Sequence, residues 1–355
     1  MLISVVIRSR DEAERLRLTL ASLVPQASDA EVIVVNDGST DGTPAVLAEA
    51  ARWLPLRVVT HERPRGRAGA ANAGASIARG DVLLFLDGDT LAGPALLERH
   101  AAVQAAGTGR IGRGETFHLR GTRFLQDPEA GTPRAGEEAR FARVDQRELS
   151  RLRVTLADVL GNFASIESRA VPGIYPGAGP RRLNELEMDA LHRHPECSVL
   201  WAAASGSNLS VARDAFIRVG GFDETMDINE HRELALRLCE YGARVAAVDG
   251  ARSYHLTHRA GWRDPLRDRR WETVFYRAHP IPAVKLLAIF WASLSPQYRI
   301  PAAARINSLP ALEQAAARSD YDYDAVRELI GSLSQIPDSP ADDGVPNACA
   351  AGTGE

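Results

Sequence analysis

Lysine is almost absent from this chain of 355 residues, since Lys285 is the single lysine among 42 basic residues. The 46 acidic residues slightly outnumber the basic ones, and the formal net charge is −4. A chain with this balance has no overall attraction to nucleic acid or to an anionic membrane. We therefore expect no nucleic-acid partner, and a single arginine carries little weight as a functional signal.

Cysteine and long apolar runs are also scarce. The three cysteines, Cys197, Cys239 and Cys349, form neither a CxxC pair nor a disulfide framework, which fits a reducing cytoplasm. The first residues show no basic region or cleavage site of the kind found in signal peptides, so we expect none, and no apolar run reaches the roughly 20 residues of a membrane span. The longest apolar segment, 281–294, is predicted to be a core helix, with peripheral contact with a membrane surface as the alternative.

Short apolar runs alternate with helical segments over the first ninety residues. The apolar runs, rich in β-branched residues and leucine, lie at 2–7, 31–35, 56–60 and 81–86. The helical segments between them lie at 11–24, 43–54 and 67–79. This alternation is typical of an α/β fold with a parallel sheet covered on both faces, and such sheets bind ligands at the carboxyl ends of their strands.

Polar clusters follow three of these strands, at 8–11, 36–42 and 87–90. Because the strand ends share one edge of the sheet, we expect these clusters to build one site. In the third cluster Gly88 lets the chain turn sharply, so that Asp87 and Asp89 can reach the same small volume. Such oxygen ligands suit Mg²⁺ or Mn²⁺, which also binds a diphosphate. A plain surface turn is the alternative.

Four segments carry a more specific signal. They are SVVIRSRDEAERL (4–16), EVIVVNDGSTDGT (31–43), RAGAANAGASIARGDVLLFLDGD (67–89) and GSNLSVARDAFIRVGGFDE (206–224). In this order they resemble the signatures of family 2 glycosyltransferases. The resemblance implies the GT-A fold, with a mainly parallel central sheet and helices on both faces. It also implies a nucleoside-diphosphate sugar as co-substrate and Mg²⁺ or Mn²⁺ as cofactor.

The resemblance assigns roles to the strand ends. It implies that Asp37 binds the nucleobase, that Asp87 contacts the ribose, and that Asp89 holds the metal, with Asp87 as a second candidate ligand. Arg8 and Asp11 stand where many members of the family have proline and asparagine. We expect both at the donor site.

Further donor-site residues follow from the same resemblance. Asn72 belongs to an N-x-G motif whose helix lies close to the nucleotide. Gly206, Ser207 and Asn208 belong to a loop that lines the sugar pocket. Trp201, just upstream, could lie under a sugar ring or in the core.

The segment NEHRELALRL, 229–238, resembles the family's base segment, E-D-x-E-L-x-x-R-L, with His231 in place of the catalytic aspartate. We expect Asn229 to cap a helix on which Glu230 and Glu233 lie one turn apart. An inverting transfer needs a base that takes a proton from the acceptor hydroxyl. Glu230 is the first candidate, followed by His231 and Glu233. Alternatively, the acidic residues only stabilise the start of the helix.

Two histidines are further candidate metal ligands, ranked below Asp89. Related transferases place a metal-binding or phosphate-binding histidine about 25 residues after the base segment, and here SYHLTHR offers His255 and His258. Packing and surface roles are the alternative for both.

The domain organisation follows from these matches. We expect a GT-A domain at 1–262, divided into a nucleotide-binding half (1–100), a variable insertion (110–200) and a catalytic half (200–262). The insertion, with helical material at 145–169 and a Pro/Gly-rich loop at 170–182, is expected to shape the acceptor site. A helical extension at 263–334 and a disordered tail at 335–355 follow.

The sequence thus predicts a metal-dependent, inverting glycosyltransferase that uses a UDP-linked or related sugar. The acceptor stays open between small molecules, glycans, lipid-linked sugars and peptides. Two alternatives belong to other classes. One is a nucleotidyltransferase. The sequence near the first strand has no glycine-rich basic loop of the kind that binds a triphosphate, which counts against this alternative. The other is a catalytically impaired nucleotide-sugar-binding module, which His231 makes plausible.

Overall fold

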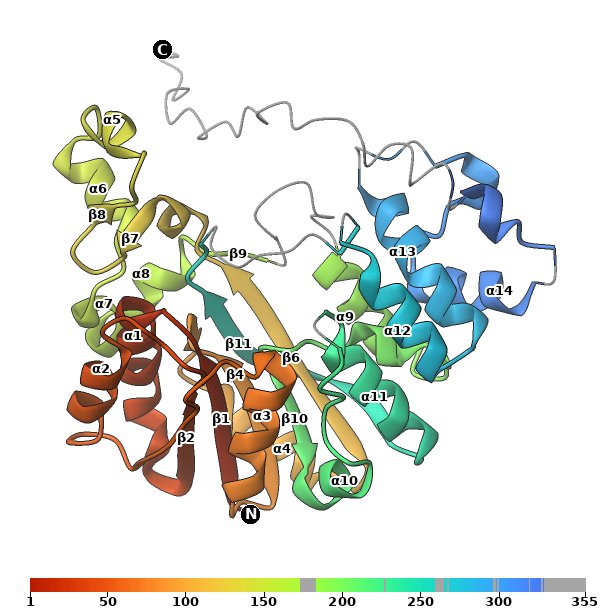
Figure 1. Cartoon of the computed structure of the whole chain (residues 1–355), viewed down its shortest axis with the longest axis horizontal. Coiled ribbons are helices and arrows are strands. Elements are labelled where there is room, and N and C mark those ends of the chain that lie inside the picture. The colour runs from red at the N-terminus through yellow and green to blue at the C-terminus, as the bar shows by residue number, and fades with distance from the viewer. Residues whose placement is uncertain are drawn as a thin grey trace, which may run out of the picture.

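The computed structural model describes residues 1–172, 183–226, 228–258, 265–266, 268–295, 298, 300–318, 320–326 and 328. A nine-stranded sheet runs through the molecule in the order β3-β2-β1-β4-β10-β6-β11-β5, and β9 pairs with β6 at the side of this path (Figure 1). Its strands are β1 Ile3–Ser9, β2 Ala30–Asn36, β3 Leu56–Thr60, β4 Val82–Asp87, β5 Thr90–Ala92, β6 Arg110–His118, β9 Val171–Pro172, β10 Leu209–Ala212 and β11 Arg244–His255. A separate pair is formed by β7 Leu125–Asp127 and β8 Thr132–Pro133.

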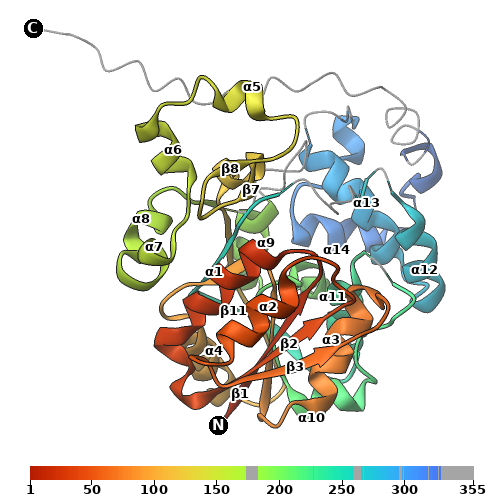
Figure 2. The same cartoon turned by 60° about the vertical axis from the view of Figure 1, so that its left-hand side comes forward.

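The sheet is mainly parallel, as predicted. The strands β3, β2, β1 and β4 pair in parallel, and the first three lie side by side in Figure 2. The strand β10 runs antiparallel to both β4 and β6, so β6 and its parallel partner β11 share the direction of β4. Only β10, β5 and the short β9 run the other way among the strands of this sheet in the described residues.

Helices cover both faces of the sheet, because successive residues of its buried strands point to opposite sides. Val5 packs with helices α1 and α2, and the next residue, Val6, packs with α3. The helices of the first layer are α1 Ala13–Leu23, α2 Thr43–Ala50 and α4 Leu96–Ala105. Those of the second are α3 Gly66–Ile77, α9 Leu183–Arg193, α10 Arg213–Arg218 and α11 Glu230–Glu240. Short 3₁₀ helices lie at η1 Val24–Asp29, η2 Arg120–Phe124, η3 Leu200–Ala203 and η4 Ala302–Ala304.

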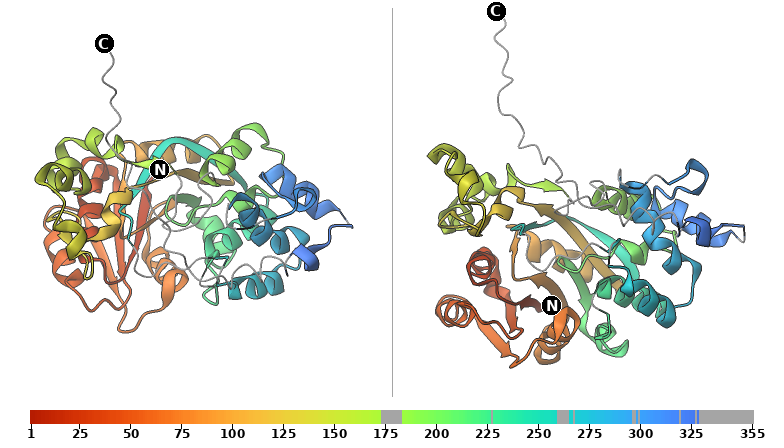
Figure 3. Two further views of the ribbon diagram at one scale, coloured as in Figure 1. Left: turned by 90° about the horizontal axis from the view of Figure 1, so that it is seen from above. Right: turned by 45° about the horizontal axis from the view of Figure 1, so that its top comes forward.

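Two helical groups flank the sheet at opposite ends of the molecule (Figure 3). One lies within the expected insertion and consists of α5 Glu138–Phe141, α6 Gln146–Leu152, α7 Leu156–Gly161 and α8 Phe163–Glu167. The other is the C-terminal group of α12 Arg270–Ala278, α13 Pro282–Leu294 and α14 Leu309–Ala317. The helix α13 is buried on most of its surface in the larger core, as the core-helix prediction for 281–294 requires.

One strand of the central sheet lies at the start of the expected insertion. Residues 110–118 form β6, a strand of the central sheet between β10 and β11, so the sheet continues into the segment expected to be variable. Most of the predicted loop 170–182 and the whole predicted tail 335–355 lie outside the described residues, as does Cys349. Cys197 and Cys239 are free thiols. No helix in the described part of the chain has the length and apolar character needed to cross a membrane.

Candidate active site

The polar ends of β1, β2 and β4 meet at one edge of the sheet, as predicted. In the parallel register Ser9 lies opposite Asn36, and Arg8 lies opposite Asp87. Gly88 continues the turn after β4 so close to Ser9 that a Cβ at this position would lie 2.7 Å from the Ser9 Cβ. Glycine is therefore required here for the two strand ends to approach.

The second aspartate of the DGD turn meets both candidate histidines. The Asp89 Oδ2 atom lies 3.0 Å from Nε2 of His255 and 2.6 Å from Nε2 of His258, and one donor atom from each residue falls within 4.8 Å of the others. Burial disfavours charge on Asp89, but the two imidazoles outweigh burial and hold its pKa well below the usual range. A carboxylate and two imidazoles at this spacing can hold a divalent cation.

Two residues that lie next to this cluster were not predicted from the sequence. The His118 Nδ1 atom lies 3.1 Å from Nδ1 of His255, so the nitrogen of His255 that points away from Asp89 meets a second imidazole. The Glu12 carboxylate lies 3.7 Å from Nε2 of His258, and burial together with Asp89 and Asp87 raises its pKa well above the usual range. Glu12 directly follows the polar cluster 8–11, which was the available signal. His118 ends a strand that the sequence did not reveal.

The first aspartate of the turn points to a different partner. Arg8 donates from Nε to Asp87 at 2.6 Å and from Nη1 to Glu230 at 2.8 Å. Burial disfavours the charged form of Glu230, but the Arg8 guanidinium, with smaller contributions from His231 and Arg67, outweighs burial and holds the pKa of Glu230 far below its usual range. Asp87 and Asp89 therefore face separate parts of the site, and Arg8 connects one of them to the first-choice base.

The three candidate bases lie in different surroundings. Glu230 is buried beside Arg8, and Nδ1 of His231 lies 3.7 Å from its second carboxylate oxygen. Glu233 instead accepts two hydrogen bonds from Arg237 on the next turn and one from His279 of the C-terminal group. Glu233 is thus engaged away from Arg8.

The helix that carries these residues begins without the predicted cap. Asn229 has a left-handed backbone, and its side chain makes no capping hydrogen bond.

The expected nucleotide side is built from turns and a helix start. Asp37 accepts hydrogen bonds from the backbone N–H groups of Arg65 and Gly66 at the start of α3, and lies 2.7 Å from Nδ1 of His61. Asp11, with a positive φ of 53°, accepts from the backbone N–H of Thr40 and so ties the ends of β1 and β2 together.

Asn72 and Asn208 have their side chains engaged by the protein itself. Asn72 exchanges two hydrogen bonds with the backbone of Phe222, which fixes α3 to the loop after α10. Asn208 is fully buried, accepts from His100 and donates to the backbone carbonyls of Glu115 and Ala251. The structure brings neither amide to the cluster around Asp89.

The loop that begins at Gly206 does reach the site. The Gly206 carbonyl lies 3.5 Å from Nη2 of Arg8, and a Cβ on Gly206 would lie 3.0 Å from that nitrogen and 3.1 Å from Nδ1 of His231. Ser207 follows in the same loop and is half-buried. Trp201 is buried against Phe275 and belongs to the core.

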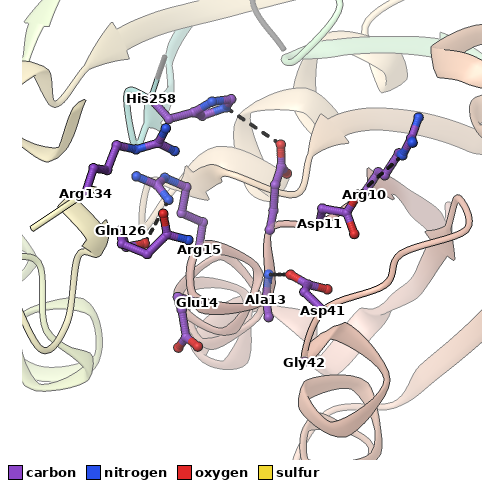
Figure 4. A pocket seen from close by; sticks show the side chains of 11 residues that line it. Arg10, Asp11, Ala13, Glu14, Arg15, Asp41, Gly42, Gln126, Arg134 and His258 are labelled. Carbon is purple, nitrogen blue, oxygen red and sulfur yellow. Dashed lines mark hydrogen bonds and ion pairs between the residues drawn. The ribbon is translucent and has the colours of Figure 1, made fainter. Parts of the chain in front are cut away.

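A cavity of about 380 Å³ opens beside this edge. His258, Arg15 and Arg134 lie on one side of it, and Arg10 and Asp41 lie on the other (Figure 4). Its full lining is Arg10, Asp11, Glu12, Ala13, Glu14, Arg15, Asp41, Gly42, Gln126, Arg134 and His258. Residues 126 and 134 come from the segment after β6, so the expected insertion forms part of the wall.

The mainly parallel sheet, its two helical layers and the carboxylate–histidine cluster at the strand ends define an α/β protein of the GT-A class. Residues 4–110 match the family model "Glycosyl transferase family 2". The chain belongs to this family, as the four sequence signatures predicted.

Curated relatives and solved structures agree with this assignment. Validoxylamine A glucosyltransferase of Streptomyces hygroscopicus subsp. jinggangensis is 30% identical over 250 residues, which are 68% of this chain and 52% of the relative. The chain spans about half or less of the length of the curated relatives it matches.

Two solved structures share the fold over most of the chain. S. aureus TarS (residues 1–349), in complex with UDP-GlcNAc, has a TM-score of 0.52 and 14% identity over 94% of this chain and 84% of that one. The mannosyltransferase PcManGT from Pyrobaculum calidifontis, in complex with GDP-Man and Mn²⁺, has a TM-score of 0.52 and 18% identity over 93% of this chain and 84% of that one.

Proposed function

We propose that this protein is a metal-dependent, inverting glycosyltransferase that moves a sugar from a nucleoside diphosphate to an acceptor hydroxyl. The observation that carries the proposal is the contact of Asp89 with His255 and His258 at the edge where Arg8 joins Asp87 to Glu230. Metal-ligand chemistry and a candidate base therefore lie at the same end of the sheet, where α/β folds bind their ligands.

The donor set favours a transition ion over Mg²⁺. His255 and His258 would supply two imidazole nitrogens and Asp89 one carboxylate oxygen, whereas Mg²⁺ prefers oxygen ligands alone. Mn²⁺, which accepts both ligand types, is our proposed cofactor. When bound, such an ion stabilises the negative charge of a departing diphosphate.

Glu230 is the proposed base. As the acceptor oxygen attacks the anomeric carbon, its O–H proton passes to Glu230 and the bond between that carbon and the diphosphate oxygen breaks. The nucleoside diphosphate leaves with the bonding electron pair, and displacement from the opposite side inverts the anomeric centre. We rank Glu230 above Glu233 because Glu233 is bonded to Arg237 and His279, away from Arg8.

The donor is proposed to be UDP-linked. The fold-level neighbour TarS was solved with UDP-GlcNAc, while PcManGT was solved with GDP-Man, so the base needs a direct test. For the acceptor, we propose that the segment after β6 contributes to its choice, because Gln126 and Arg134 line the cavity beside His258.

Calorimetric titration with UDP, GDP, dTDP and CDP, each with and without Mn²⁺, tests the proposal. We expect one diphosphate to bind tightly and to depend on the metal. The Asp89→Asn variant should lose that metal dependence, and the Asp249→Asn variant, which alters an exposed carboxylate paired with His192, should keep it. Absence of binding to all four diphosphates would contradict the proposal.

One observation favours a second function. His231 replaces the aspartate of the family's base segment, which is compatible with a nucleotide-sugar-binding module that no longer transfers sugar. The two functions are separated by incubating the protein with the nucleotide sugar whose nucleotide binds in the titration and measuring release of nucleoside diphosphate. A transferase releases the diphosphate, whereas a binding module does not turn over its ligand.

A further inference from the structure

The ring of His231 is held in one tautomer by its neighbour. The Nε2 atom of His231 lies 2.8 Å from Nη1 of Arg232. A guanidinium carries only donors, so Nε2 must accept this hydrogen bond through its lone pair. Burial, to which the charge of Arg232 adds, lowers the pKa of His231, so the ring is neutral at pH 7. In a neutral ring of this kind the hydrogen resides on Nδ1.

Arg232 is itself fixed on several sides. It donates to the backbone carbonyl of Ala202, to the side chain of Asn229 and to Glu187, and its guanidinium carbon lies 5.0 Å from the centre of the Trp291 ring. The other carboxylate oxygen of Glu187 accepts from Arg113 at 2.7 Å. Because these charges are buried, turning Arg232 away would leave its guanidinium without these partners and Glu187 with Arg113 as the remaining cation of this network.

The donor at Nδ1 faces the candidate base and has no hydrogen-bond acceptor among the described residues. Nδ1 of His231 is buried and makes no hydrogen bond to any of the described residues. It lies 3.7 Å from Oε2 of Glu230, which is longer than a hydrogen bond, and beside Gly206 and Arg8. Buried donors are almost always paired in folded proteins, so an unpaired one next to a candidate base points to a missing ligand.

A donor and an acceptor side by side match the chemistry of a hydroxyl group. A hydroxyl can give its hydrogen to Oε2 of Glu230 and accept a hydrogen from Nδ1 of His231 through an oxygen lone pair. An aspartate at position 231 could only accept. An ammonium group could only donate, and a neutral amine has a single lone pair, which its attack on the anomeric carbon uses, so neither can accept the N–H of His231 during transfer.

We propose that His231 is a specificity-determining residue whose Nδ1–H donates to the oxygen of the acceptor hydroxyl while the hydrogen of that hydroxyl points to Glu230. The proposal rests on the glycosyltransferase function given above and names hydroxyl groups, as opposed to amines, as the acceptor chemistry. Arg232 is a positioning residue, because it acts through the tautomer of His231, and Glu187 supports Arg232.

The tautomer can be measured in the free protein without any donor. In the full chain with ¹⁵N-labelled histidine, a long-range ¹H–¹⁵N correlation spectrum at pH 7 separates the two tautomers and the charged ring. The His231→Asn variant assigns the signal among the nine histidines. We expect a neutral ring with the hydrogen on Nδ1. A hydrogen on Nε2, or a charged ring, overturns the proposal independently of whether the protein transfers sugar.

Variants of Arg232 test the positioning role. Arg232→Lys keeps a donor beside Nε2 and should keep the Nδ1–H tautomer, whereas Arg232→Met removes the donor and should give a mixture. The same spectrum shows whether each variant is folded, through the signals of the other histidines. An unchanged tautomer in folded Arg232→Met would contradict the positioning role of Arg232. If the methionine variant does not fold, Arg232→Lys decides the question, because a hydrogen on Nε2 of His231 in that variant would also contradict the role.

Variants of His231 test the substrate contact. An asparagine side chain can place an N–H near the position of Nδ1, whereas an aspartate places an acceptor there. With hydrolysis of UDP-glucose, UDP-GlcNAc and GDP-mannose as probes and water as the hydroxyl acceptor, we expect His231→Asn to keep kcat/KM within about fivefold and His231→Asp to lose about 10–100-fold. Equal losses in the two variants would overturn the donor role of His231.

Discussion

Arg8 and Glu230 form an ion pair 2.8 Å long across the candidate active site, joining the end of the first strand to the start of α11. The same guanidinium also forms an ion pair with Asp87, so one cation is shared by two carboxylates. A carboxylate held this firmly in its charged form is a weak base.

Substitution of Arg8 should move the pH dependence of turnover. Without the guanidinium, the pKa of Glu230 rises, because the largest contribution that opposes burial is lost. The acid limb of the kcat/KM profile for Arg8→Gln should therefore shift upward by about 1–3 pH units. Arg8→Lys keeps a charge and serves as the control. If the acid limb of Arg8→Gln lies at the same pH as that of the unmodified protein, Glu230 is not the group that takes up the proton in the rate-limiting step.

Glu230 and Glu233 provide a matched pair of substitutions on one helix. Glu230→Gln should lower kcat by about 10²–10⁴-fold with little change in nucleotide binding, because it removes the proposed base and keeps the shape. Glu233→Gln should leave kcat within a few fold but lower the free energy of unfolding by about 1–3 kcal/mol, since Arg237 and His279 lose their charged partner. Rates and denaturant unfolding of both variants check this; the reverse pattern would make Glu233 the base.

Binding of metal should stabilise the fold through the cluster around Asp89. A ligand at 100 times its dissociation constant adds about 2.7 kcal/mol to the free energy of unfolding. We expect Mn²⁺ to raise Tm more than Mg²⁺ at equal concentration, and His258→Ala to abolish the difference. Thermal melts after treatment with EDTA provide the baseline. Equal shifts with both ions in the unmodified protein would argue for a site built of oxygen ligands.

His100 should make the stability pH-dependent. This fully buried side chain lies between Ser210 and Asn208, and burial lowers its pKa from 6.5 to about 4. Below pH 6.5 the unfolded chain binds a proton that the folded protein refuses, so stability falls as the pH drops towards 4. The loss due to this residue is about 3 kcal/mol. His100→Gln, which can keep both hydrogen bonds, should remove that part of the pH dependence in urea unfolding curves.

The strands and helices of the first half were predictable because each is encoded locally. Runs such as 82–86 are buried on both sides of the sheet and therefore read as continuous apolar segments. The strand β6 at 110–118 was missed because it contains Gly112, Gly114 and charged residues, and its place is fixed by pairing with β10 and β11. Here long-range contacts override the weak local signal.

Within the site, the sequence identified the residue types but not their partners. It placed Asp87 and Asp89 together as ligands of one ion, whereas folding directs Asp87 to Arg8 and Asp89 to the histidines. It ranked Glu230 and Glu233 by family resemblance, and only their neighbours distinguish them.

The sequence by itself determined the alternation of strands and helices, the edge at which the polar clusters meet, and membership of family 2, because spacing and local motifs carry these properties. Tertiary structure alone decided which carboxylate meets which cation. Arg8 and Glu230 are 222 residues apart, and the tautomer of His231 depends on Arg232, which is held in turn by Glu187 from another helix. Charge partners of this kind arise only when packing brings distant segments into contact and excludes the water that would otherwise solvate them.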